Sequence, residues 1–142
     1  MPKYLLSFFL TAILVTPSLS IAQKSNLSVN SAWIRAPIDD TSQLSLYFNI
    51  YNQGEQTDYL IDCKADISNK TIINKTVRIN GINKTVVIEK VALPPKTEVK
   101  FQPLGIYLVI KNVSDKITKG DDIKVSLFFT KSGLIEFIAS VK

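Results

Sequence analysis

Apolar and polar residues alternate along several short segments of this chain. Between positions 44 and 51, Leu44, Leu46, Phe48 and Ile50 alternate with Ser, Tyr and Asn residues, which is the two-residue period of a strand with one buried face. No window keeps the period of an amphipathic helix over three turns. Gly, Pro, Asn and Asp residues mark turns between the segments. The pattern predicts an all-β domain, a Greek-key sandwich or barrel of about seven to nine strands. Further expected strands, rich in apolar and β-branched residues, are 85–91, 106–110, 123–129 and 134–141.

One hairpin is predicted to the residue. The segment Ile79-Asn80-Gly81-Ile82 fits a two-residue type I′ loop between two alternating segments. Such a loop pairs Thr76 with Thr85 and Asn74 with Val87. Asn74 and Thr85 would then be diagonal neighbours on one face, with Cα atoms about 7–8 Å apart.

The N-terminal segment has the order of a secretory signal peptide. An early lysine precedes an apolar run of eleven residues, Leu5–Val15, and small residues then lead up to Ala22. A helix of that run would be about 16 Å long, against about 30 Å of hydrocarbon in a bilayer. We therefore expect a signal peptide over 1–22, cleavage after Ala22, and a mature domain over 23–142. The protein would be periplasmic or secreted, without a stable membrane anchor after cleavage. The residue directly after the expected cleavage site is Gln23 and not Cys, so we expect no lipid anchor there.

Composition removes several kinds of chemistry. The chain has no His, one Cys, and one Met, which is the initiator. Catalysis through His is excluded, and so are imidazole metal ligands and an intrachain disulfide. No pair of carboxylates has a spacing that argues for acid–base catalysis, and we do not expect an enzyme. The 17 Lys and Arg residues outnumber the 12 Asp and Glu residues, but Arg occurs only at 35 and 78. We therefore expect no nucleic-acid partner.

Several motifs resemble a known family. The first half of the chain and the second half both carry segments similar to the bacterial periplasmic copper chaperones called PCu(A)C. These segments are Ser31–Pro37, Tyr47–Gly54, Asp58–Leu60, Leu93–Pro94, Lys119–Asp121 and Val125–Phe129. The resemblance implies a cupredoxin-like β-sandwich. It also implies a protein that carries Cu(I), and sometimes Cu(II), and that supports copper loading of cytochrome c oxidase, so its partners would belong to respiratory oxidase assembly.

The family's copper ligands follow the pattern His-x10-Met-x21-His-x-Met. Laid on this chain without a gap, the pattern assigns the two His positions to Asn74 and Tyr107, and the two Met positions to Thr85 and Val109. All four ligands are replaced. Cu(I) favours thioether, thiolate and imidazole donors, which these four side chains do not offer. We therefore expect no metal site at these positions and no bound copper cofactor.

Cys63 is the one soft ligand of the mature chain. Simple alternation would put it on the same strand face as Tyr59 and Ile61. It is expected either as a small buried hydrophobe or as a free thiol, exposed or paired with another molecule. Trp33 is expected in the core or at its rim, and Arg35 near an acidic partner or a ligand.

Three interpretations of function remain open. The first is an exported PCu(A)C-like protein that keeps a role in copper delivery or oxidase assembly through protein contacts. The second is a repurposed β-sandwich module that binds a protein, a peptide or a small ligand at the altered site. The third is a structural or host-contact secreted protein with an unrelated task.

Overall fold

Ten strands and no helix make up the described part of the chain. The structure is a computed structural model that describes residues 26–38 and 42–142. The expected signal peptide and its cleavage site lie outside these residues, and within them no helix is long and apolar enough to cross a bilayer. The strands are β1 (Leu27–Ile34), β2 (Leu44–Asn52), β3 (Asp58–Ala65), β4 (Lys70–Ile79), β5 (Ile82–Ile88), β6 (Val91–Leu93), β7 (Thr97–Phe101), β8 (Ile106–Lys111), β9 (Asp122–Phe129) and β10 (Gly133–Val141).

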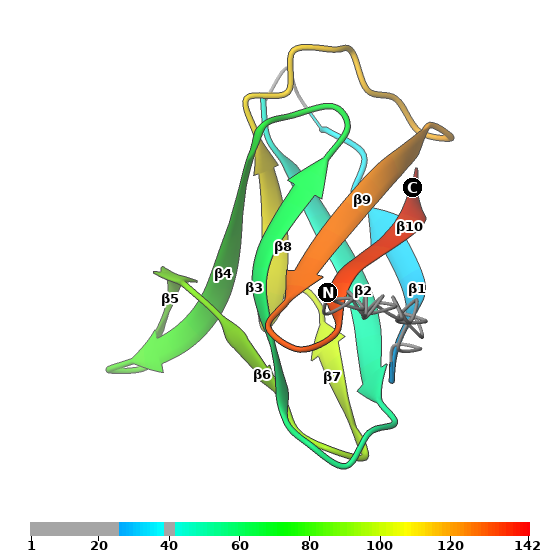
Figure 1. Cartoon of the computed structure of the whole chain (residues 1–142). Coiled ribbons are helices and arrows are strands. Elements are labelled where there is room, and N and C mark those ends of the chain that lie inside the picture. The colour runs from blue at the N-terminus through cyan, green and yellow to red at the C-terminus, as the bar shows by residue number, and fades with distance from the viewer. Residues whose placement is uncertain (1–25, 39–41) are drawn as a thin grey trace, which may run out of the picture.

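The strands form one continuous sheet that folds over on itself. Their order is β5-β4-β8-β7-β2-β1-β10-β9-β3-β6. Figure 1 shows β3, β9 and β10 in front of β1, β2 and β8, so the sheet makes the two layers of a sandwich. The layers are continuous through β1 and β10, which run parallel and pair Trp33 with Ser140 and Ile34 with Val141. The all-β class and the sandwich architecture are therefore confirmed.

The strand count exceeds the seven to nine expected. The β-branched run 85–91, which we expected as one strand, ends β5 at Ile88 and starts β6 at Val91. These two strands lie at opposite ends of the sheet order. The chain therefore crosses from one end of the folded sheet to the other within Glu89 and Lys90. Residue propensity does not reveal this crossing, because both parts of the run are good strand formers.

The core lies between the two layers. Leu46, Phe48 and Ile50 of β2 are almost fully buried, as their alternation predicts. Phe48 stacks on Phe101 of β7, with ring centroids 4.3 Å apart, and contacts Phe137 of β10 at 5.6 Å. The aromatic pair joins neighbouring strands, and the contact with Phe137 joins the two layers.

The predicted hairpin is confirmed in full. Ile79 pairs with Ile82, and the loop residues Asn80 and Gly81 have φ values of 50° and 77°, as a type I′ turn requires. Thr76 faces Thr85, and Asn74 faces Val87. The β4–β5 hairpin projects away from the body of the sandwich (Figure 1).

Two register shifts change which side chains face the core. In β3, a shift between Leu60 and Asp62 turns Cys63 inward, so Cys63 is buried while Ile61 is 45% exposed. The expectation that Cys63 shares a face with Ile61 is therefore wrong, because the bulge inserts one extra residue. In β1, a shift that includes Ser31 turns Trp33 to the outer side of the sheet, opposite Tyr47.

Candidate functional site

The four positions that the resemblance assigns to copper ligands lie on one face of the sheet. Asn74 on β4 and Tyr107 on β8 are direct cross-strand partners. Thr85 on β5 pairs with Thr76 and is therefore a diagonal neighbour of Asn74. Val109 follows Tyr107 by two residues on β8 and points to the same side. The fold thus brings together residues that are separated by up to 35 positions in sequence, because β8 pairs with β4 along its length.

The four side chains differ in their surroundings. Thr85 is exposed, whereas Asn74 and Tyr107 are half-buried. Val109 is only 7% exposed and is packed into the sheet surface. The Oδ1 atom of Asn74 is enclosed and accepts no hydrogen bond from another described residue. The face is therefore partly filled, and a new ligand could reach it most easily from the side of Thr85.

Aromatic rings extend this face across three strands. Trp33 of β1 lies against Tyr47 of β2, with ring centroids 4.6 Å apart. Tyr47 in turn contacts Tyr107 of β8, with centroids 6.1 Å apart. The sequence gives a signal for this row, because Tyr47 alternates with the buried residues of β2 and must point away from the core. It gives no signal that Trp33 joins the row, since the bulge in β1 decides that.

A shallow cavity of about 320 Å³ opens at the end of the aromatic row. Thr85 and Tyr107 line it, but Asn74 and Val109 do not. Arg35 also lines it, and none of the ion pairs among the described residues includes this side chain. The complete lining is Arg35, Ser45, Tyr47, Thr76, Asn83, Thr85, Pro103, Leu104 and Tyr107. From the sequence, we assign Thr85 and Tyr107 to the altered site and expect Arg35 near an acidic partner or a ligand.

The chemistry of this cavity does not suit Cu(I). Its polar groups are hydroxyls, an amide and the Arg35 guanidinium, with no thioether, thiolate or imidazole. Cu(I) binds soft donors, and a guanidinium repels a cation. Nor does the described part of the chain contain a cluster of three or more His, Cys, Asp or Glu side chains placed to hold a metal ion. The cavity is better matched to neutral or anionic groups.

Cys63 lies away from this face and is shielded from solvent. It is a free cysteine with 3% of its surface exposed, in the core cluster. Burial raises the pKa of its thiol to about 12. At neutral pH the side chain is therefore a thiol and not a thiolate, which removes the form that binds metals or attacks disulfides. Of the alternatives open from the sequence, the structure has the buried hydrophobe.

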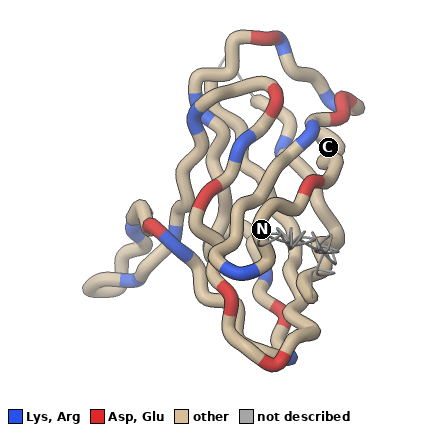
Figure 2. The backbone as a smooth tube through the Cα atoms, viewed as in Figure 1, with Lys and Arg blue, Asp and Glu red and all other residues tan. Residues whose placement is uncertain are grey.

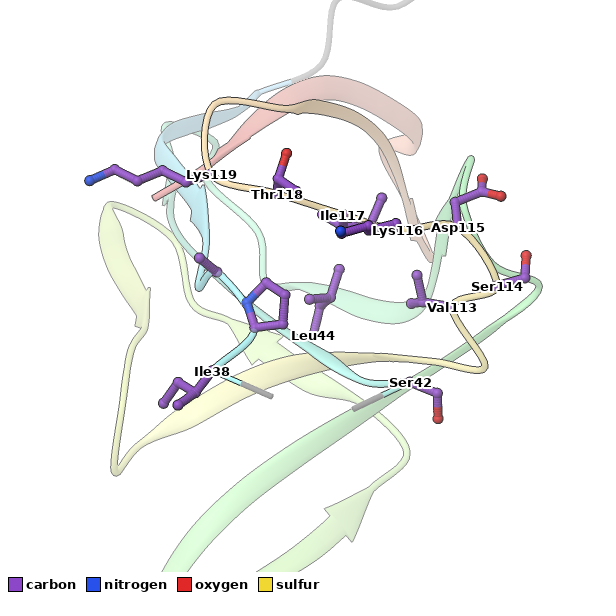
Figure 3. Close-up of a pocket in the computed structure, with 12 residues that line it drawn as sticks. Ile38, Ser42, Leu44, Val113, Ser114, Asp115, Lys116, Ile117, Thr118 and Lys119 are labelled. Carbon is purple, nitrogen blue, oxygen red and sulfur yellow. The ribbon is translucent and has the colours of Figure 1, made fainter. Parts of the chain in front are cut away.

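A larger cavity lies elsewhere, at the end of the sandwich. It measures about 630 Å³ and is lined mainly by the segments that follow β1 and β8, together with Ser42 and Leu44. Figure 3 shows Leu44 and Val113 toward its interior, while Ser114, Asp115 and Lys119 project away from it. The polar side chains do not converge, so this cavity offers no evident binding chemistry.

Comparisons with known proteins agree with this architecture. Residues 27–141 match the family described as "Putative lipoprotein LpqE-like". A search of curated protein sequences gives no significant match. Among solved structures, the apo PCuAC domain from PmoF1 is similar at 25% identity, with 83% of this chain and 94% of that chain covered and a TM-score of 0.71.

Two further structures share the fold. The copper-bound PCuAC domain from PmoF2 has 22% identity over 83% of this chain and 93% of that one, with a TM-score of 0.70. The solution structure of apo-DR1885 from Deinococcus radiodurans has 16% identity over 100% of this chain and 96% of that one, with a TM-score of 0.63. The fold expected from the sequence motifs is therefore confirmed.

Proposed function

The chain belongs to the LpqE-like family, and from that premise we propose that it is an exported protein of the copper-chaperone type that holds no copper itself and acts through contact with partner proteins. The observation that carries the proposal is the chemistry of one sheet face. There, the positions assigned to copper ligands hold the amide of Asn74, the hydroxyl of Thr85, the phenol of Tyr107 and the aliphatic side chain of Val109.

No other residue replaces the lost donors. The sequence has no His, and its only Met is the initiator. Cys63, the one remaining soft donor, is buried and protonated. A phenol binds a metal well only as the phenolate, a form that is costly to reach at neutral pH. The face is therefore expected to bind Cu(I) weakly.

The family setting supports a role beside copper proteins. One similar structure is a copper-bound PCuAC domain and another is the Cu(I) form of DR1885, so these proteins bind copper. We propose that this chain works in the same setting, copper delivery or oxidase assembly, by binding a partner that carries the metal. This role needs no catalytic group.

Export is part of the proposal. Residues 1–22 would direct the chain across the inner membrane, and the mature domain would begin at Gln23. Intact-mass measurement of the exported protein tests this directly. A product that still carries residues 1–22 would contradict it.

Copper competition tests the central claim. Purified mature protein, kept reduced, is titrated with Cu(I) against a strong chelator. We expect the wild type and Cys63→Ser to leave the metal with the chelator. Tight one-to-one binding that survives in Cys63→Ser would show that the donor inventory is incomplete, and tight binding by the wild type alone would show that Cys63 is an accessible donor.

Restoring the donors tests the assignment of the positions. The variant carries Asn74→His, Thr85→Met, Tyr107→His and Val109→Met, and it should bind Cu(I) more tightly than the wild type. Val109→Met enlarges a packed side chain, which costs about 1–3 kcal/mol, so a variant with only the other three changes is made as well.

A matched control puts one His and one Met on the opposite face of the same hairpin. Lys75 and Val86 are cross-strand partners there, and Lys75→His with Val86→Met should gain no comparable affinity. Folding of each variant is checked by circular dichroism. A folded four-site variant that binds no more tightly than the wild type would refute the assignment.

A further inference from the structure

We propose that the open edge of β5 binds an extended, acidic segment of a partner protein, which adds to the sheet as an eleventh strand. The inference rests on the proposed function, because it names the surface through which that function would make its protein contact. Its evidence is separate from the copper chemistry. It comes from the backbone, the apolar side chains and the charges of the β4–β5 hairpin.

The backbone of β5 presents unpaired hydrogen-bonding groups. β5 is the last strand in the sheet order, and among the described residues no strand pairs with its outer edge. Ile79 and Ile82 flank a two-residue loop and form a hydrogen-bonded pair, so hydrogen-bonded and open pairs alternate from there. The N–H and C=O groups of Asn83, Thr85 and Val87 therefore point outward.

The neighbouring strand β4 supports this assignment of outward-pointing groups. The N–H of Thr76, opposite Thr85, turns away from β5 and donates to the carbonyl of Gly105 at 2.9 Å. In an open pair both residues direct their backbone groups away from each other. The outward direction at Thr85 follows from the same geometry.

Three usual protections of an edge strand are missing here, and Lys84 is the one charged side chain of β5 that would disfavour pairing with an unmatched strand. β5 is seven residues long and contains no Pro and no bulge, whereas the strand at the other end of the sheet, β6, has three residues. Short length, Pro and bulges are common ways to prevent edge pairing. A long, regular and exposed edge is the geometry to which extended peptides add in β-augmentation.

Apolar side chains next to this edge lack a cover. The inner face of the sandwich continues onto the projecting hairpin (Figure 1), where Ile79 is 45% exposed, Ile82 62% and Val86 37%. These residues lie on the side that faces the core farther along β4, at Ile73. An added strand would bury part of this surface, which favours association.

The hairpin is basic. β4 and β5 carry Lys70, Lys75, Arg78 and Lys84 and no acidic residue, whereas the other described residues carry eleven basic and ten acidic side chains. Figure 2 shows several blue Lys and Arg segments on the projecting arm, with one red segment beside them. The ion pairs found among the described residues do not include any of the four. β4 and β5 together thus hold most of the net positive charge of the described residues.

Register defines the chemistry of the partner strand. On the inner face of β5, Lys84 lies between Ile82 and Val86, since alternate residues share a face. A matching segment would place a carboxylate beside Lys84 and apolar side chains on either side. Cross-strand pairs of this kind set specificity, and like charges oppose pairing.

Charge and backbone chemistry favour an acidic strand at the β5 edge over a second copy of this chain or a membrane surface. A second copy would bring another basic hairpin to the edge and repel it. A membrane surface would attract the charge but would leave the outward N–H and C=O groups without partners, which lipid cannot supply. An acidic strand satisfies the charges and the backbone together.

The probe is a synthetic, acetylated and amidated peptide of alternating valine and threonine with one central glutamate. Its control has lysine in place of the glutamate. Both are titrated into the isotope-labelled mature protein, and amide chemical shifts and hydrogen exchange are followed by NMR. We expect protection at Asn83, Thr85 and Val87, with binding about three- to tenfold weaker for the lysine peptide.

Variants separate edge pairing from general attraction. Val87→Pro removes one outward N–H and leaves the β4–β5 bonds in place, so it should weaken binding about fivefold relative to Val87→Ala. If Val87→Pro does not fold, Lys84→Glu provides the test, because it should reverse the preference between the two peptides.

Several outcomes would overturn the proposal. These are no protection along β5, equal binding of both peptides, or Val87→Pro that binds as well as Val87→Ala. A β5-paired dimer of the free protein would favour a second copy instead, and binding to anionic vesicles without any peptide effect would favour a membrane. Tight copper binding with intact peptide pairing would refute the proposed function alone.

Discussion

Replacing Asp58 with Asn tests the hydrogen bonds that connect the start of β3 to the turn between β9 and β10. Asp58 begins β3 and is 3% exposed. Its Oδ1 accepts hydrogen bonds from the N–H of Tyr59 at 2.8 Å, the hydroxyl of Thr130 at 2.9 Å and the N–H of Lys131 at 2.9 Å. Its Oδ2 accepts from the N–H of Ser132 at 2.9 Å. One carboxylate thus ties β3 to the turn between β9 and β10.

The expected loss of stability follows from these four bonds. In Asp58→Asn, an NH2 group replaces Oδ2 if Oδ1 keeps its three hydrogen bonds. Two donors then face each other, because this NH2 group lies against the N–H of Ser132, and that N–H loses its acceptor. A buried donor left without a partner costs about 1–3 kcal/mol, and the other three bonds lose the benefit of the charge. Relief from burying a carboxylate offsets part of this loss. We expect the free energy of unfolding to fall by about 3 kcal/mol, and by more in Asp58→Ala.

The pH dependence provides a second readout. Burial alone would raise the pKa of Asp58, but the hydrogen bonds to its carboxylate outweigh burial and hold the pKa below its ordinary value. A group with a lowered pKa stabilises the fold above its unfolded pKa, at about pH 4, and loses that contribution as the pH falls through the folded value. The difference between wild type and Asp58→Asn should therefore be largest near neutral pH and shrink in acid.

Urea unfolding, followed by circular dichroism, measures this difference at several pH values. Trp33 is the only tryptophan of the chain and gives a second signal by fluorescence. The reasoning would be refuted by an Asn variant within about 0.5 kcal/mol of the wild type at pH 7. A difference that stays constant into acid would refute the pKa argument alone.

Three other perturbations have defined outcomes. Gly81→Val should destabilise the hairpin by about 1–2 kcal/mol, because φ is 77° at this position and a β-branched residue resists positive φ. The cost is not a steric clash, since no atom lies within 4 Å of an added Cβ. Unchanged hydrogen exchange along β4 and β5 would contradict this prediction. Cys63 should resist iodoacetamide at pH 8 in the folded protein and react after unfolding, since burial raises the pKa of its thiol to about 12; rapid labelling of folded protein would show that the thiol is accessible. Phe48→Ala should lower the free energy of unfolding by about 3–5 kcal/mol, because it removes buried apolar area and the contact with Phe101. A loss below about 1 kcal/mol would mean that the core repacks to fill the cavity.

The parts of the structure that the sequence predicts correctly depend on residues that are close together in the chain. The alternation of Leu46, Phe48 and Ile50 determines the inner face of β2, because adjacent side chains of a strand point to opposite sides. Asn80 and Gly81 determine the hairpin, because few residues adopt positive φ at both loop positions and a two-residue loop leaves one register. The placement of Asn74 next to Thr85 follows from that loop.

Other features required the tertiary structure because they depend on strands far away in sequence. The shift in β3 that buries Cys63 arises from pairing with β9, and the shift in β1 that turns Trp33 outward arises from pairing with β2. A shift of one residue exchanges the two faces of a strand, so simple alternation fails beyond it. The division of 85–91 between the two ends of the sheet has the same kind of cause.

The candidate site combines both kinds of information. From the sequence come the chemistry of its positions, above all the lack of soft donors at Asn74, Thr85, Tyr107 and Val109. The tertiary structure decides what surrounds them: the aromatic row, the arginine at the cavity, and the open edge of β5. Residue types set which bonds a site can form, but only the pairing of distant strands sets which residues meet there and which backbone groups stay unpaired.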